Sequence, residues 1–79
     1  MKFLIQASGD APVIVTFEPS GAEYSIGAGD HMVVEWPDAD GPLMGTIQHS
    51  PTGLTVGEPS GRMARIWNSS GAELSILGQ

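Results

Sequence analysis

The chain has 79 residues, with nine acidic and three basic side chains, a net charge of −6 and no cysteine. A chain of this length is expected to form one domain over residues 1–79, since domains span about 50 to 250 residues. Without cysteine, it has no disulfides, no thiolate metal sites and no thiol catalysis. Three cations are too few for the clusters of Lys and Arg that bind phosphate groups, so nucleic acids and anionic membranes are disfavoured as partners.

The first strand is expected at residues 2–6. The apolar part of this segment is too short for a secretory signal, which needs about 7–15 apolar residues. No apolar stretch in the sequence approaches the roughly 20 residues of a membrane span. We therefore expect a cytoplasmic protein.

Eleven glycines and six prolines divide the sequence into short segments, at the spacing of about 8–12 residues typical of an all-β sandwich or barrel. The fold predicted is a small antiparallel sandwich or barrel of about eight short strands. The strands are expected near 2–6, 12–17, 22–26, 31–36, 43–49, 53–57, 62–67 and 72–77.

One segment occurs twice. Residues 20–26 read Ser-Gly-Ala-Glu-Tyr-Ser-Ile, and residues 70–76 read Ser-Gly-Ala-Glu-Leu-Ser-Ile. The similarity extends back to Phe17, which aligns with Trp67. This predicts two similar hairpins and a pseudo-symmetric fold.

Alternation along the strands predicts the core, because residues two apart on a strand share a face. The predicted core residues are Phe3, Ile5, Val13, Val15, Phe17, Tyr24, Ile26, Met32, Val34, Trp36, Ile47, Leu54, Val56, Leu74 and Ile76. The strand at 62–67 is ambiguous. The repeat favours Met63, Arg65 and Trp67 facing inward, and the alternative turns Ala64 and Ile66 inward.

A second apolar set falls on the face opposite the core. It comprises Leu4, Ile14, Val33, Met44 and Ile66. Irregular strands could tuck some of these side chains into edges or bulges. The alternative is an interface with a protein partner or a second copy, because contiguous exposed apolar surface favours association.

No metal and no other cofactor are expected. His31, Glu35 and His49 are residue types found in metal sites, but nothing in their spacing brings His49 near the other two. Asp38-Ala39-Asp40-Gly41 resembles the start of a calcium loop. Position 49, where such a loop requires a bidentate Glu, is a histidine.

Two tryptophans close to polar residues suggest a sugar-binding platform as the alternative function. Such a lectin-like or small-ligand site would use Trp36, Asp38, Asp40, Trp67 and Asn68. Buried tryptophans in the core are the competing interpretation, because alternation places both residues inward.

Catalysis is disfavoured, since the sequence has no Gly-x-Ser-x-Gly motif. A chain this short also has little room for the cleft that paired catalytic carboxylates need. The leading hypothesis is therefore a small acidic binding module, not an enzyme, that acts by protein–protein interaction. An accessory, inhibitor or immunity-type protein, or a viral structural part, would fit, either as a homodimer or bound to another protein.

Overall fold

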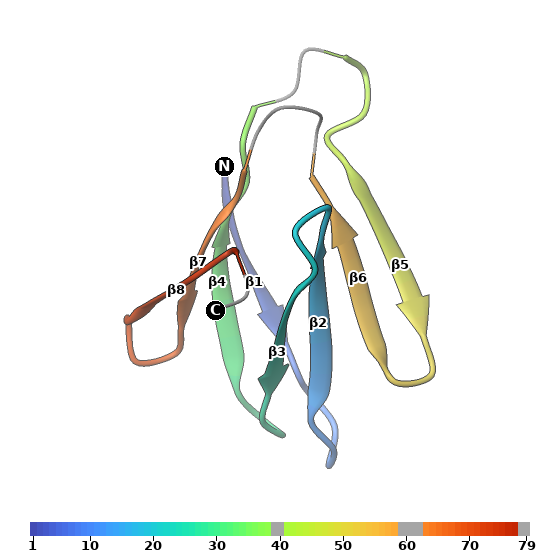
Figure 1. The fold of residues 1–79 in the computed structure, drawn as a ribbon. Coiled ribbons are helices and arrows are strands. Elements are labelled where there is room, and N and C mark those ends of the chain that lie inside the picture. The colour runs from blue at the N-terminus through green and yellow to red at the C-terminus, as the bar shows by residue number, and fades with distance from the viewer. Residues whose placement is uncertain (39–40, 59–62, 78–79) are drawn as a thin grey trace.

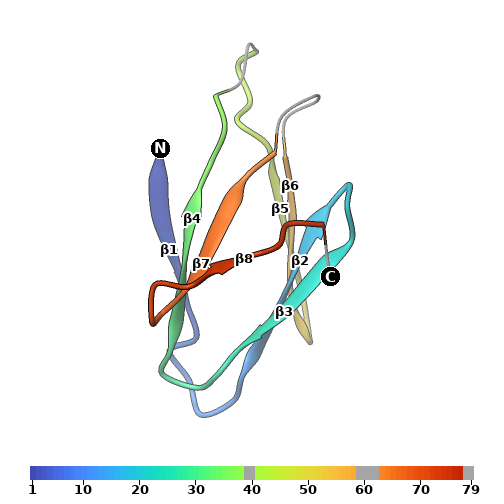
Figure 2. The same ribbon diagram turned by 60° about the vertical axis from the view of Figure 1, so that its left-hand side comes forward.

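The computed structural model describes residues 1–38, 41–58 and 63–77, in which eight strands and no helix form two stacked sheets (Figures 1 and 2). Sheet A has the order β1 (Lys2–Gln6), β4 (His31–Glu35), β7 (Arg65–Asn68), β8 (Glu73–Leu74). Sheet B has the order β3 (Ala22–Ile26), β2 (Val13–Glu18), β6 (Gly53–Gly57), β5 (Thr46–Ser50). The predicted all-β fold of about eight short strands is confirmed, and of the two predicted architectures, sandwich or barrel, the structure shows the sandwich. In the described part of the chain, no helix is long and apolar enough to cross a membrane.

One strand pair differs from the predicted antiparallel arrangement. β2 and β6 are parallel, with Val15 opposite Leu54 and Phe17 opposite Val56, whereas the other five pairs are antiparallel. The chain leaves sheet B after β3, forms β4 in sheet A and returns through β5. No tight turn therefore joins β2 to β6 or sets their relative direction.

The core lies between the two sheets and follows the predicted alternation over most strands. Its largest fully buried side chains are Phe17, Ile66, Val15, Val34 and Val56. Phe3, Val13, Tyr24, Leu54, Leu74 and Ile76 are half-buried around it. Among the described residues, no buried side-chain nitrogen or oxygen lacks a hydrogen bond.

The two similar hairpins lie in different sheets and differ in register by one residue. Gly21 and Gly71 occupy matching turn positions, with φ of +80° and +92°, where glycine avoids the steric cost of a Cβ atom. Phe17 nevertheless pairs with Ala22, whereas Trp67 pairs with Glu73. The second turn is therefore one residue longer than the first.

Asn68 accounts for the longer turn. Its Oδ1 accepts hydrogen bonds from the backbone N–H groups of Ser70 and Ala72, at 3.1 and 3.0 Å. Asn68, the last residue of β7, therefore caps the turn with its side chain, as in an Asx turn.

A one-residue change of register turns every side chain of a strand to its other face. The inward placement of Met63, Arg65 and Trp67 was therefore wrong. Ala64 and Ile66 are buried, and Met63 and Arg65 are exposed.

The two sides of the sandwich, where the edges of sheet A and sheet B meet, differ in how they are covered. On the β3 side, Ser20 Oγ donates to the carbonyl of Ile76, and Tyr24 Oη donates to that of Ser75, both at 2.5 Å. The segment after β8 thus joins sheet A to sheet B, as Figure 2 shows.

On the opposite side, β5 extends sheet B away from the strands of sheet A (Figure 1). Ile47 pairs with buried Val56 and so faces inward, yet 68% of its surface is exposed. Its predicted core position was wrong because nothing in sheet A covers β5.

Ile66 and Leu4 test the face assignment of sheet A, because both are aliphatic but lie on opposite faces. Ile66→Ala should lower the free energy of unfolding by about 2–5 kcal/mol, since it leaves a cavity in the core. Leu4 is 52% exposed, so Leu4→Ala should change the free energy of unfolding by no more than about 0.5 kcal/mol. Urea unfolding of the two variants measures both values. Equal losses would mean that the faces are assigned incorrectly.

Candidate functional site

An apolar groove opens where the two sheets separate, between β1 and β5. It has a volume of about 160 Å³ and is lined by Met1, Phe3, Trp36, Met44, Gly45, Thr46, Ile47 and Val56. A cavity of roughly 150 Å³ is large enough for a benzene molecule. The groove can therefore accept one apolar side chain from outside.

Trp36 forms the base of this groove and is only 5% exposed. Its indole Nε1 donates a hydrogen bond to the carbonyl of Met44, and its ring is tilted by 52° against Phe3 at a centroid distance of 6.1 Å. Gly45 lies against the indole with φ of +145°. A Cβ atom at this position would lie 2.6 Å from the ring Cζ2, so only glycine allows the loop before β5 to pass so close.

Among the described strands, none pairs with the outer edge of β5. The β5–β6 ladder ends at Ser50 and Gly53, which flank a two-residue turn. In such a hairpin the flanking pair exchanges hydrogen bonds, and bonded pairs then alternate along the ladder. The N–H and C=O groups of Ile47 and His49 therefore point away from β6, toward the open edge.

β5 also lacks the features that commonly protect edge strands, such as charges, proline or very short length. Its sequence is Thr-Ile-Gln-His-Ser, and all five residues are exposed. The other edge strands differ. β1 carries Lys2, β3 carries Glu23, and β8 has only two residues. Among the described strands, β5 is thus the edge most open to pairing with another strand.

The predicted interface residues do not share one face. Leu4 and Val33 are register partners on the outer face of sheet A, whereas Ile14 lies on the outer face of sheet B. Ile66 is fully buried, so its predicted outward position was wrong for the register reason given above. Met44 precedes β5 and lines the groove.

The predicted ligand-binding residues are also separated. Trp36 faces the interior, Trp67 lies on the outer face of sheet A, and Asn68 caps the turn after β7. Asp38 is exposed. Asp40 lies outside the described residues. The two tryptophans therefore do not form a shared platform.

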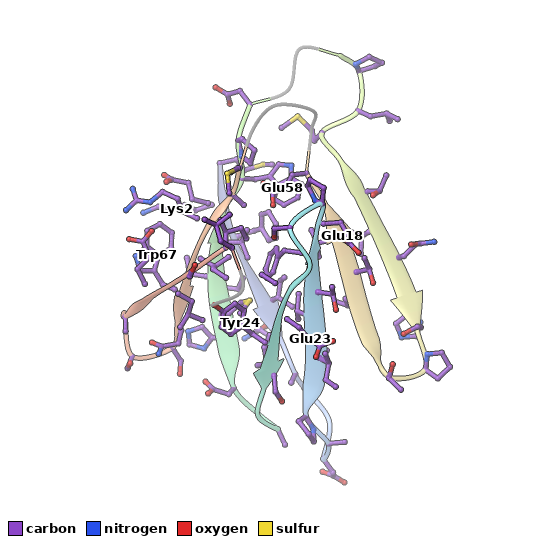
Figure 3. All side chains as sticks on the ribbon, viewed as in Figure 1. Lys2, Glu18, Glu23, Tyr24, Glu58 and Trp67 are labelled. Atoms are coloured by element: carbon purple, nitrogen blue, oxygen red, sulfur yellow. The ribbon has the colours of Figure 1, made fainter. Side chains whose placement is uncertain are left out.

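Trp67 instead organises the cations of sheet A. Lys2 Nζ and Arg65 Cζ lie 5.2 and 5.1 Å from the centroid of its ring, a cation–π arrangement. Figure 3 shows Lys2 and Trp67 side by side on the outside of the molecule. Arg65 also donates two hydrogen bonds to Glu73, at 3.0 and 2.9 Å.

His31 and His49 lie in different sheets, on β4 and β5. Within residues 1–38, 41–58 and 63–77, no three His, Cys, Asp or Glu side chains gather closely enough to hold a metal ion. The absence of metal binding remains a prediction.

Glu58 was not singled out by sequence reasoning. Its Oε2 accepts a hydrogen bond from the backbone N–H of Ala64 at 2.7 Å, so it links the end of β6 to the start of β7. Burial raises the pKa of this carboxyl, in spite of that hydrogen bond.

The groove and the open edge were also missed, although the sequence contains a signal for them. Residues 41–57 include no Asp, Glu, Lys or Arg, in a chain of net charge −6. This neutral segment covers the loop before β5, β5 itself and β6. The charge pattern marks the region but does not reveal that β5 is uncovered.

Comparison with protein-family models, curated proteins and solved structures finds no match for this chain.

Gly45 and Gly41 provide a matched test of the groove. Gly45→Ala should destabilise the protein by about 1–3 kcal/mol, because the new methyl group meets the Trp36 ring. It should also change the Trp36 fluorescence. A Cβ atom added at Gly41 would have no other atom within 4 Å. Gly41→Ala should therefore change the free energy of unfolding by no more than about 0.5 kcal/mol. Thermal unfolding followed by fluorescence distinguishes the two. Equal stability of both variants would contradict the close approach.

The Arg65–Glu73 pair predicts a pH dependence. Hydrogen bonds from Arg65 lower the pKa of Glu73. The resulting stabilisation is present above the unfolded-state pKa and is lost as the pH falls through the lower folded-state value. Glu73→Gln should therefore lower the Tm at pH 7, and the difference should shrink below about pH 4.

Glu58→Gln is the control of opposite sign. Burial raises the pKa of Glu58, so the stability that this carboxyl contributes is present at low pH and is lost as the pH rises through its folded-state value. Glu58→Gln should raise the Tm at pH 7 and have less effect at acidic pH. If Glu73→Gln lowered the Tm equally at pH 3 and pH 7, the ion pair with Arg65 would not be the cause of the destabilisation.

Proposed function

We propose that this protein is a binding module for other polypeptides, not an enzyme, and that it accepts an extended strand at the edge of β5. The observation that carries the proposal is the position of β5, whose Ile47 and His49 direct their backbone groups to an edge that no described strand occupies, beside an apolar groove. An added strand would pair with these groups, and backbone pairing of this kind is a general mode of peptide recognition.

The groove would supply selectivity. Side chains alternate between the two faces of a strand, so every second residue of the incoming strand would point toward the inner face of sheet B. Ile47 and the base formed by Trp36 lie on that side. A large apolar residue at one such position would cover Ile47, and burial of a side chain of this size contributes about 1.5–3 kcal/mol.

Selection from a displayed library of random peptides tests this function. Peptides that bind should contain an apolar residue within an extended segment, shift the NMR amide signals of β5 and change the fluorescence of Trp36. Ile47→Lys should weaken their binding by about tenfold or more, because a charge replaces apolar contact in the groove.

Leu4→Lys is the matched control, since it places the same charge at an exposed aliphatic residue on the outer face of sheet A. It should leave binding within about twofold of the original value, because no contact with the peptide is lost. If Leu4→Lys weakens binding and Ile47→Lys does not, the binding surface is the outer face of sheet A and the proposal is wrong. Failure to select any peptide that perturbs β5 would also contradict it.

A further inference from the structure

We infer that the strand bound at β5 is β5 of a second copy of this chain, paired antiparallel about a two-fold axis at Gln48. This inference rests on the proposed function, since it names the occupant of the same edge. It follows from three features of β5: its charge, its hydrogen-bonding pattern and the placement of its side chains.

The charge pattern favours contact between copies at β5 over contact at β3, the other edge of sheet B. Two molecules that each carry a net charge of −6 repel one another. The repulsion between surface charges falls off over a Debye length of about 8 Å at physiological salt. Residues 41–57 carry no charged side chain, so contact through β5 keeps the acidic groups of both copies out of the interface. Contact through β3 would instead bring Glu23 of each copy into it.

The hydrogen-bonding pattern of β5 is self-complementary. A two-fold axis at Gln48 places Ile47 of one copy opposite His49 of the other. Both residues direct their N–H and C=O groups to the open edge, so each such pair exchanges two hydrogen bonds. The axis generates this pair twice, which gives four backbone hydrogen bonds. An axis at Ile47 would instead place His49 opposite Gly45, which lies outside the strand.

The side chains also meet without an unpaired charge. On the outer face, the Gln48 amides of the two copies lie opposite each other, and an amide can both donate and accept a hydrogen bond. On the inner face, Ile47 lies beside the imidazole of His49 from the second copy. The two four-stranded B sheets would join into one continuous sheet.

Light scattering after size-exclusion chromatography, over a range of concentrations, is the first test. The mass should approach twice the chain's 8.2 kDa as concentration rises. A mass that stays at 8.2 kDa up to millimolar concentration would overturn the inference. If that monomer still bound selected peptides at β5, the proposed function would stand. If it bound none, both would fall.

Two variant pairs test whether β5 forms the dimer contact. Gln48→Glu places two carboxylates together at the axis and should raise the dimer dissociation constant by about tenfold or more. Ser25→Glu adds the same charge on β3, at the opposite edge of sheet B, and should change it by less than about twofold, because it lies outside the contact. Similar weakening by both variants would show that the contact is not centred on Gln48.

His49→Pro removes the edge-facing N–H and leaves the β5–β6 hydrogen bonds in place, whereas His49→Ala keeps the N–H. Only the proline variant should raise the dimer dissociation constant, by about tenfold or more, because the two-fold axis makes each lost hydrogen bond occur twice. Equal dimerisation of both variants would overturn the inference. Circular dichroism verifies folding, and Gln48→Glu provides the decisive comparison if the proline variant unfolds.

Discussion

The position of Trp36 between the sheets is the constraint on which the open side of this sandwich depends. The indole packs on Phe3 of sheet A, and its N–H is bonded to the carbonyl of Met44, just before β5. Gly45 lets the backbone pass directly against the ring. A large planar side chain thus fixes the start of β5 at a distance from β1. The sheets cannot close over Ile47 while this packing persists, and the groove is the space that remains.

The opposite side of the molecule shows what closure requires. There, the hydroxyl groups of Ser20 and Tyr24 bond to the backbone after β8, so a short segment of chain covers the gap between the sheets. No described segment covers β5 in this way, because the chain turns back into β6 through a two-residue turn. The two sides differ in how the chain continues: the segment after β8 crosses to sheet B, whereas the tight turn after β5 leads straight back into sheet B.

Period-two alternation and the spacing of Gly and Pro were sufficient to predict an all-β sandwich or barrel, about eight strands and most of the core, but not to choose between the two architectures. They failed where the register or the neighbouring sheet decides the outcome. Trp67 aligns with Phe17 in sequence, but the Asn68 cap lengthens the turn by one residue and reverses the faces of β7. Alternation correctly predicts that Ile47 lies on the inner face of its strand, but it does not predict whether another sheet covers that face. The candidate site could not be predicted for the same reason, since it arises from a strand without cover.

The distribution of charge gives the uncovered strand a specific physical context. An exposed edge strand is ordinarily a risk for uncontrolled association, and proteins commonly counter it with charge. Here β1 and β3 carry Lys2 and Glu23, and all nine acidic residues lie outside residues 41–57. Contact through β3 would bring two Glu23 carboxylates together and so be opposed by repulsion, whereas the hairpin of β5 and β6 carries no charged side chain to oppose contact. The acidity and the open edge therefore act together. In the proposed pair, the charge would favour association at this edge, and pairing there would hide the strand from further partners. A closed pair is the outcome that both features favour, because an axis at Gln48 uses up the open edge of each copy and leaves no free β5 on which a fibre could grow.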